Sequence, residues 1–359
     1  MTAACDDCLR RAWLLAALGG HLERTGSRLA ELLELDDDEL VRAVGGRHRP
    51  DLEARLGQLD PQAARDRAAH EGLELICRCD HDYPALLWAL PSSPAVLHVS
   101  GDLERFIALA EQETVAIVGT RRPSSYGLDV ARTLARELAA SGLTVVSGMA
   151  FGIDSAAHEG ALSAGGATIA ILPGGAERAH PASQRALYRR ITATGCAVSE
   201  LPPRSEVWRW MFPARNRLIA GLAAMTLVVE ASHGSGALIT TRWAQTLGRP
   251  IGAVPGRVTS EQAAGPNCLL KNGAHPITGA QDVLDALYGA GVRRANTDRR
   301  PEPEPALRRW LRAIADGHDT PAALARLGLD PDQSLQVLSA LELSGHIRRE
   351  VGGRFAVMP

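Results

Sequence analysis

Two arginines and a glycine-rich loop lie close together in the second half of the sequence, and both favour anion binding. Residues 212–222 read Phe-Pro-Ala-Arg-Asn-Arg-Leu-Ile-Ala-Gly-Leu, so Arg215 and Arg217 flank Asn216. An apolar strand and the loop Ser-His-Gly-Ser-Gly at 232–236 follow. A helix that begins near Asn216 offers free N–H groups and a positive dipole end to negative charge. The sequence therefore predicts a phosphate site here.

Three further glycine-containing loops follow apolar runs earlier in the chain. Glycine lets the backbone approach a ligand, and arginine forms charge-assisted hydrogen bonds with phosphate. Each loop alone is equally consistent with ordinary turn chemistry, because glycine is common wherever φ is positive. Four such loops on successive strands favour one anion cleft outside the carboxyl ends of a sheet. The residues expected in this cleft are Gly119, Thr120, Arg121, Arg122, Ser147, Gly148, Gly174, Gly175, Arg215, Asn216, Arg217, Ser235 and Gly236.

The loop at 119–127 contains neither a GxGxxG motif nor a Walker lysine. Dinucleotide and P-loop nucleotide chemistry both depend on those motifs. We therefore expect no bound cofactor.

The overall charge argues against a polybasic nucleic-acid binder. The 359 residues carry a formal net charge of −2, with a pI near 6.6. Net charge governs non-specific attraction to nucleic acid, so any such site must be local. Between Arg178 and Arg217 the chain has eight arginines and two glutamates, which supplies a local positive region.

Cysteine usage and the N-terminal sequence bear on the compartment. The six cysteines are too few and too scattered for a disulfide framework. The apolar run at 12–18 is too short for a membrane span or a secretion signal. We expect a cytoplasmic protein without a membrane segment.

Four segments with different patterns follow one another along the chain. Residues 1–72 show helical spacing at 8–18, 27–33, 37–44 and 61–72, which predicts a helical module of the SAM or helix-hairpin-helix kind. Residues 73–290 alternate apolar runs with amphipathic helices, which predicts an α/β, extended Rossmann-like domain with a parallel sheet. The runs are 115–118, 144–146, 168–172, 197–199, 227–229 and 251–254.

Residues 291–305 contain three prolines and no apolar periodicity, as expected of a linker. Residues 306–359 then show three helical patterns, near 306–315, 320–327 and from 331 to 345. A hairpin with a Gly352-Gly353 turn follows. Three helices and a hairpin predict a winged-helix domain.

Several blocks of the middle segment resemble the DNA-processing protein A family, also called DprA or Smf. They are 115–121 (Val-Ala-Ile-Val-Gly-Thr-Arg), 147–158 (Ser-Gly-Met-Ala-Phe-Gly-Ile-Asp-Ser-Ala-Ala-His), 212–222 and 235–240 (Ser-Gly-Ala-Leu-Ile-Thr). The resemblance implies a cytoplasmic homodimer that binds and protects single-stranded DNA and assists loading of the recombinase RecA, in natural transformation or in recombination. It implies no catalytic reaction. It places Gly119, Thr120 and Arg121 in a basic DNA pocket, together with the residues at 215–217.

One position departs from that family. Its members often read Tyr-Pro-Lys-x-Asn where residues 180–185 here read His-Pro-Ala-Ser-Gln-Arg, so a pocket lysine is missing. Arg185 lies one helical turn further on and is expected to replace the lysine.

Two groups of side chains could do other chemistry. Asp154 and His158 stand four residues apart on one helix face, where acid–base catalysis or metal binding competes with a helix cap and a buried polar contact. The pairs Cys5-x-x-Cys8 and Cys77-x-Cys79 could bind zinc together if the helical module folds back on the first strand. Buried free thiols are the simpler interpretation of the cysteines, and the cap that of Asp154.

The aromatic residues Trp208, Trp210 and Phe212 alternate before Pro213. Their rings could stack on the bases of a single strand or could cover a sheet edge or a dimer contact.

Two other functions remain open. The Pro-Gly-Gly loop at 173–175 is similar to that of lysine-decarboxylase-like nucleoside monophosphate phosphoribohydrolases, but the rest of their PGGxGTxxE motif is absent at 176–180. A winged-helix duplex-DNA regulator is the third possibility, although residues 330–345 contain no lysine or arginine. Protein contact is an equally good prediction for that domain.

Overall fold

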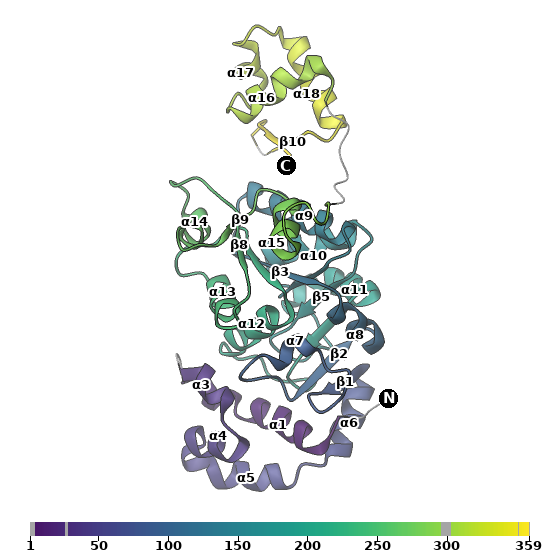
Figure 1. The fold of residues 1–359 in the computed structure, drawn as a ribbon, viewed down its shortest axis with the longest axis vertical. Helices are drawn as coiled ribbons and strands as arrows, with labels where there is room; N and C mark the ends of the chain where they lie inside the picture. The colour runs from purple at the N-terminus through teal and green to yellow at the C-terminus, as the bar shows by residue number, and fades with distance from the viewer. Residues whose placement is uncertain (1–3, 26–27, 296–302, 351, 359) are drawn as a thin grey trace. The chain divides into compact units, whose positions relative to one another are not determined.

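The structure is a computed structural model that describes residues 4–25, 28–295, 303–350 and 352–358. Its contacts divide the chain into two compact units, Met1–Asn296 and Thr297–Pro359. Figure 1 shows their helices and strands. In the described ranges, no helix combines the length and the apolar character needed to cross a membrane.

The first unit is built around a nine-stranded sheet with the order β1-β2-β6-β5-β4-β3-β7-β8-β9. The strands from β6 to β9 pair in parallel, whereas β1 and β2 form an antiparallel edge next to β6. The mostly parallel α/β sheet that the apolar runs predicted is therefore confirmed. The bounds are β1 Leu73–Cys77, β2 Val96–Ser100, β3 Thr114–Val118, β4 Thr144–Ser147, β5 Thr168–Ile171, β6 Cys196–Ser199, β7 Met225–Val228, β8 Ile251–Ala253 and β9 His275–Pro276.

Helices cover both faces of this sheet. In β3, Val115 and Ile117 belong to an apolar cluster shared with α9, α10 and α15, whereas Ala116 and Val118 belong to a second cluster shared with α7, α8, α12 and α13. This alternation follows from the two-residue period of a strand, which sends successive side chains to opposite faces. The helices are α7 Ala85–Trp88, α8 Leu103–Glu111, α9 Ser125–Ala140, α10 Ile153–Ser163, α11 Arg185–Thr194, α12 Met211–Leu222, α13 Ala237–Thr246, α14 Ala264–Lys271 and α15 Ala280–Tyr288.

The order of the strands reverses beside β3. From β3 the chain moves one strand at a time through β4 and β5 to β6, and it then returns to place β7 on the other side of β3. Loops that leave the carboxyl ends of β3 and β7 thus diverge and leave a crevice between them. Ligands of open α/β sheets bind at such a switch point.

The N-terminal helices pack on the sheet domain instead of standing apart from it. Leu14, Leu18 and Leu40 share one apolar cluster with Trp210 and Met211 of the later chain. Contacts therefore place these helices in the first unit, while the predicted limit at residue 72 stays a prediction. Their bounds are α1 Asp6–Ala17, α2 Gly19–Leu22, α3 Leu29–Glu34, α4 Asp37–Val44, α5 Arg49–Gly57 and α6 Pro61–His70.

The second unit contains α16 Pro305–Ala315, α17 Pro321–Ala325 and α18 Pro331–Leu343, followed by the antiparallel pair β10 Ile347–Arg349 and β11 Phe355–Val357. The Thr320 side chain caps α17 as the sequence predicted, and Trp310, Leu338 and Phe355 share a small core. This inventory matches the predicted helices and hairpin, while the winged-helix assignment remains a prediction. Residues 296–302 of the predicted linker lie outside the described residues.

Candidate functional site

A cavity of about 400 Å³ lies at the switch point between β3 and β7. We call it the switch-point cavity. Its walls come from the end of β3 and the loop after it, from the first turns of α12, and from the loop that precedes α13. Of the predicted cleft residues, those that line it are Gly119, Thr120, Arg121, Arg122, Arg215, Asn216, Ser235 and Gly236.

The 119–122 loop is held tightly against Glu230, which lies just after β7. A Cβ on Gly119 would lie 2.7 Å from the carbonyl oxygen of Glu230, so only glycine fits here. The Thr120 N–H donates to that same oxygen at 2.6 Å, and the Arg122 N–H donates to the Thr120 hydroxyl at 3.2 Å. These two amides are therefore already used, and the loop presents the exposed side chains of Arg121 and Arg122 instead.

Arg215 forms the charged floor of the cavity. Its guanidinium is buried, and Nη1 donates to the carbonyl oxygen of Ile171 at 2.6 Å. A Cβ on Gly148 would overlap this guanidinium, so Gly148 makes room for it. Burial lowers the pKa of Arg215 to about 10, an effect that Asp154 opposes and Arg121 reinforces. The side chain therefore stays charged at neutral pH.

Aromatic rings flank the arginines. The Arg121 guanidinium lies 5.1 Å from the centre of the Phe212 ring, and that ring lies 5.4 Å from the ring of His180. A side hollow of about 90 Å³ shares Arg121 and Phe212 with the main cavity and is also lined by His180 and Phe151. Phe151 is 49% exposed, which is high for a large apolar side chain.

The potential in this region is positive. Burial lowers the pKa of His180, and Arg215, Arg121 and Arg178 lower it further. Asp154 is the one carboxylate among the residues lining the main cavity. Its Oδ2 accepts the N–H groups of Gly148 and Ala150 at 3.2 and 3.4 Å.

His158 makes the buried polar contact that the sequence predicted, whereas the predicted helix cap by Asp154 is wrong. The His158 ring is fully buried, and its Nδ1 lies 2.8 Å from the Thr168 hydroxyl, which itself donates to the carbonyl oxygen of Val145. His158 therefore donates from Nδ1. Asp154 stands in the first turn of α10, but its carboxylate holds the preceding loop, whereas Gly152 occupies the N-cap position.

The predicted start of a helix near Asn216 is wrong. α12 begins at Met211, so residues 215–217 lie past its first turn, where backbone N–H groups bond within the helix. Pro213 falls in the first turn, a position where proline is tolerated. The helix that presents its N-terminus to the cavity is α13, because Gly236 and Ala237 line the wall. The Asn216 side chain donates to the Gly236 carbonyl oxygen at 3.1 Å.

Arg217 does not line the cavity. Its side chain is 2% exposed and forms an ion pair with Glu200, with 2.5 Å between Nη2 and Oε2. Positions 215 and 217 are about 200° apart around a helix, so both cannot face the same cavity. We therefore leave Arg217 out of the phosphate contacts proposed below.

The remaining predicted cleft residues also lie outside the main cavity's lining. The hydroxyl of Ser147 donates to the Ile117 carbonyl oxygen at 2.6 Å, and Gly174 and Gly175 are buried. Arg185 is exposed at the start of α11. Whether Arg185 contacts a ligand stays a prediction.

The two tryptophans serve the packing of the helical module. Trp210 is buried, and its indole N–H donates to the Gly19 carbonyl oxygen at 2.9 Å, while Trp208 packs against the same apolar cluster. Of the three alternating aromatics, only Phe212 reaches the cavity. Sequence reasoning missed Phe151 and His180, although an aromatic residue inside a Gly-Met-Ala-Phe-Gly turn was a usable signal.

Comparisons with known proteins agree on one family. Residues 74–288 match the model of the family DNA recombination-mediator protein A. The chain is 38% identical over 239 residues to the protein Smf of Synechocystis, an alignment that covers 66% of this chain and 60% of that protein. It is 35% identical over 238 residues to the DNA processing protein DprA of Bacillus subtilis, which covers 66% of this chain and 79% of that protein.

Two solved structures share the fold. The X-ray structure of DprA from Streptococcus pneumoniae aligns with a TM-score of 0.63 and 29% identity, over 80% of this chain and 99% of that one. DNA processing protein A from Helicobacter pylori, described for its single-stranded DNA binding mode, aligns with a TM-score of 0.54 and 30% identity, over 60% of this chain and 97% of that one. The chain belongs to the DNA recombination-mediator protein A family.

Proposed function

We propose that the switch-point cavity binds the phosphates of single-stranded DNA, and that the protein handles single strands in transformation or recombination. One observation carries the proposal. Arg121, Arg122 and Arg215 line one cavity at the carboxyl ends of β3 and its neighbours, beside the N-terminus of α13. Arginine side chains and a helix N-terminus both attract phosphate.

The aromatic side chains favour a single strand over a duplex. Phe212 lies against Arg121, and Phe151 is half exposed in the adjoining side hollow. Bases that are not paired can stack on such rings, and each stacked base contributes about 1–3 kcal/mol. The bases of a duplex are paired and stacked inside the double helix, so they are not free to stack on these rings.

The carboxylates favour binding over hydrolysis of a nucleotide. The Asp154 carboxylate is held by two loop amides, and Glu230 accepts the N–H and hydroxyl of Ser124 at 2.8 and 2.6 Å. A general base must reach the reacting group, and Glu230 does not line the switch-point cavity. The phosphoribohydrolase alternative therefore lacks a poised carboxylate among the described lining residues.

The second unit gives little support to duplex recognition. In its hairpin, Arg348 pairs with Glu350, Arg354 lies 3.7 Å from Asp319, and Arg349 lies over the ring of Phe355. Leu335 and Leu343 of α18 are 56% and 90% exposed, which suits contact with another protein.

The resemblance to the DprA family supports further partners. We infer that the protein acts in the cytoplasm as a homodimer, assists RecA loading, and catalyses no reaction of its own. Light scattering of the purified chain tests the dimer, and RecA filament assembly on coated single strands tests the loading. Release of free base from a nucleoside monophosphate, lost in Glu230→Ala, would instead establish the enzyme alternative.

The decisive experiment measures fluorescence anisotropy of labelled single- and double-stranded oligonucleotides over a range of salt concentrations. We expect tighter binding of the single strand. Arg121→Ala should weaken it and reduce the salt slope by about 0.7 for one lost phosphate contact. Arg42→Ala, an exposed arginine on α4, is the matched control. Equal affinities and slopes for the wild type and Arg121→Ala would refute the proposed site.

A further inference from the structure

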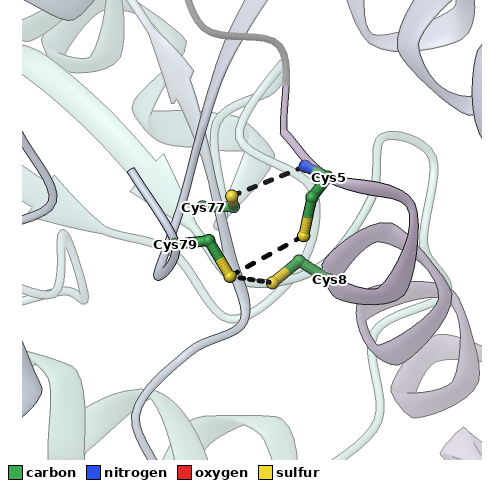
Figure 2. A group of neighbouring side chains, drawn as sticks. All are labelled: Cys5, Cys8, Cys77 and Cys79. Atoms are coloured by element: carbon green, nitrogen blue, oxygen red, sulfur yellow. Dashed lines mark hydrogen bonds between the residues drawn. The ribbon is translucent and has the colours of Figure 1, made fainter. Parts of the chain in front are cut away.

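Four cysteines from two distant parts of the sequence meet at one point of the first unit. Cys5 and Cys8 lie at the start of α1, Cys77 ends β1, and Cys79 lies in the turn that follows (Figure 2). Their sulfur atoms all lie within 4.8 Å of one another. We propose that these four residues bind a structural zinc ion.

The distances between the sulfurs fit a tetrahedral metal site. Zinc–thiolate bonds are about 2.3 Å long, so two ligands of a regular tetrahedron have sulfurs about 3.8 Å apart. The Cys5 and Cys79 sulfurs are 3.8 Å apart, and those of Cys8 and Cys79 are also 3.8 Å apart. A disulfide requires about 2.05 Å, and all four thiols are free.

The backbone around the cluster is arranged to hold thiolates. The Cys5 N–H points to the Cys77 sulfur at 3.5 Å, a contact that stabilises a negative ligand. The first two ligands also sit at the N-terminus of α1, where the helix dipole favours negative charge.

A tight turn fixes the second pair of ligands. The Asp80 carboxylate accepts the Cys77 N–H at 2.7 Å, and the Asp80 N–H donates to the Cys77 carbonyl oxygen at 2.9 Å. These two bonds hold the turn from which Cys77 and Cys79 face Cys5 and Cys8 (Figure 2). The spacing C-x-x-C and C-x-C thus supplies two ligands from each segment.

The surroundings indicate a structural ion. Cys8 and Cys77 are buried in an apolar cluster with Ala4, Leu9 and Val96. Four thiolates complete the coordination of zinc and leave no position for water, which distinguishes structural from catalytic sites. Bound in this way, the ion ties α1 of the helical module to β1 at the edge of the sheet.

A second contact fixes the same segment. Arg65 of α6 donates to the Ala4 carbonyl oxygen from Nε at 3.1 Å and from Nη2 at 2.7 Å, and it also pairs with Asp6. The chain just before Cys5 is therefore held in place independently of a metal.

The test is elemental analysis of the full-length protein, purified under reducing conditions without a metal-binding tag. We expect about one zinc ion per chain. Cys8→Ser and Cys79→Ser should each lose most of it, whereas Cys268→Ser, which removes an exposed free cysteine outside the cluster, should retain it. Unfolding midpoints should fall for the first two variants and not for the third.

A second measurement remains valid if a variant fails to fold. Wild-type protein stripped with a chelator should take up Co²⁺ and develop the thiolate charge-transfer and d–d absorption bands of a tetrahedral sulfur site, which Zn²⁺ then removes. Absence of both metals after reconstitution would overturn the proposal. So would iron with inorganic sulfide in place of zinc.

Discussion

Arg217 and Glu200 form a buried ion pair that connects α12 to the end of β6, with 2.5 Å between their nearest nitrogen and oxygen atoms. The side chains are 2% and 8% exposed. Removal of one partner leaves the other charge buried without a counter-ion. Arg217, which the local sequence predicts to be a phosphate contact, thus contributes instead to the stability of the sheet domain.

Arg217→Ala should therefore lower the free energy of unfolding by about 3–5 kcal/mol. Arg121→Ala, at an exposed position, should change it by less than about 0.5 kcal/mol. Denaturant titration measures both. If Arg217→Ala instead leaves stability intact and reduces the salt slope of DNA binding, Arg217 contacts the strand and the assignment made here is wrong.

Gly148→Ala should weaken DNA binding although it removes no charge. The added methyl group overlaps the Arg215 guanidinium, which must then leave its position under the cavity. Overpacking of this kind typically lowers the free energy of unfolding by about 1–3 kcal/mol. Gly57→Ala is the control, because a Cβ there meets no atom within 4 Å. Binding by Gly148→Ala at wild-type affinity would show that Arg215 does not contribute to the site.

The affinity for single-stranded DNA should rise as the pH falls through the range in which the His180 ring takes up a proton. Burial and three arginines lower the pKa of this ring in the free protein. A bound phosphate would offset the arginines and raise the pKa, so binding takes up a proton and is favoured at lower pH. Affinities measured between about pH 5 and 8 should show this slope, and His180→Asn should reduce it. An unchanged slope in the variant would mean that no phosphate binds near the ring.

Stability should fall on acidification because of His158. Burial, with a smaller effect of Arg215, lowers the pKa of this ring to about 3. The unfolded chain takes up the proton below its ordinary pKa of about 6.5, so the unfolded state gains stability as the pH drops from there towards the folded pKa. His158→Gln should show a flatter loss between about pH 6.5 and 4, whereas His233→Gln, at an exposed position, should follow the wild type. A steep loss retained in His158→Gln would assign the effect to other groups.

The parallel strands β3 to β8 could be predicted from sequence because each contains a short apolar run, buried except at Ile251, that ends at a loop. The exposed parallel strand β9, His275–Pro276, was not predicted. The antiparallel edge formed by β1 and β2 could not, because Glu74 and His98 interrupt the apolar pattern and their pairing is long-range. The cavity lining was recovered at Gly119–Arg122 and at Arg215. The prediction was wrong at Arg217, because the sequence does not show which face of a helix meets a cavity and which face meets a buried carboxylate.

The cysteine pairs also show what local sequence does and does not reveal. Their types and spacing identified Cys5, Cys8, Cys77 and Cys79 as candidate ligands. Their meeting depends on α1 lying against β1, a contact between residues more than 70 positions apart that local sequence cannot reveal.

The reversal of strand order beside β3 has a consequence for synthesis. The first wall of the cavity, at 119–122, leaves the ribosome early, but the facing loop at 232–236 is made only after β4, β5 and β6. A nascent chain that stops before α13 has half a site and nothing opposite it. The strand binding proposed for this cavity therefore requires a chain that has been made at least as far as α13.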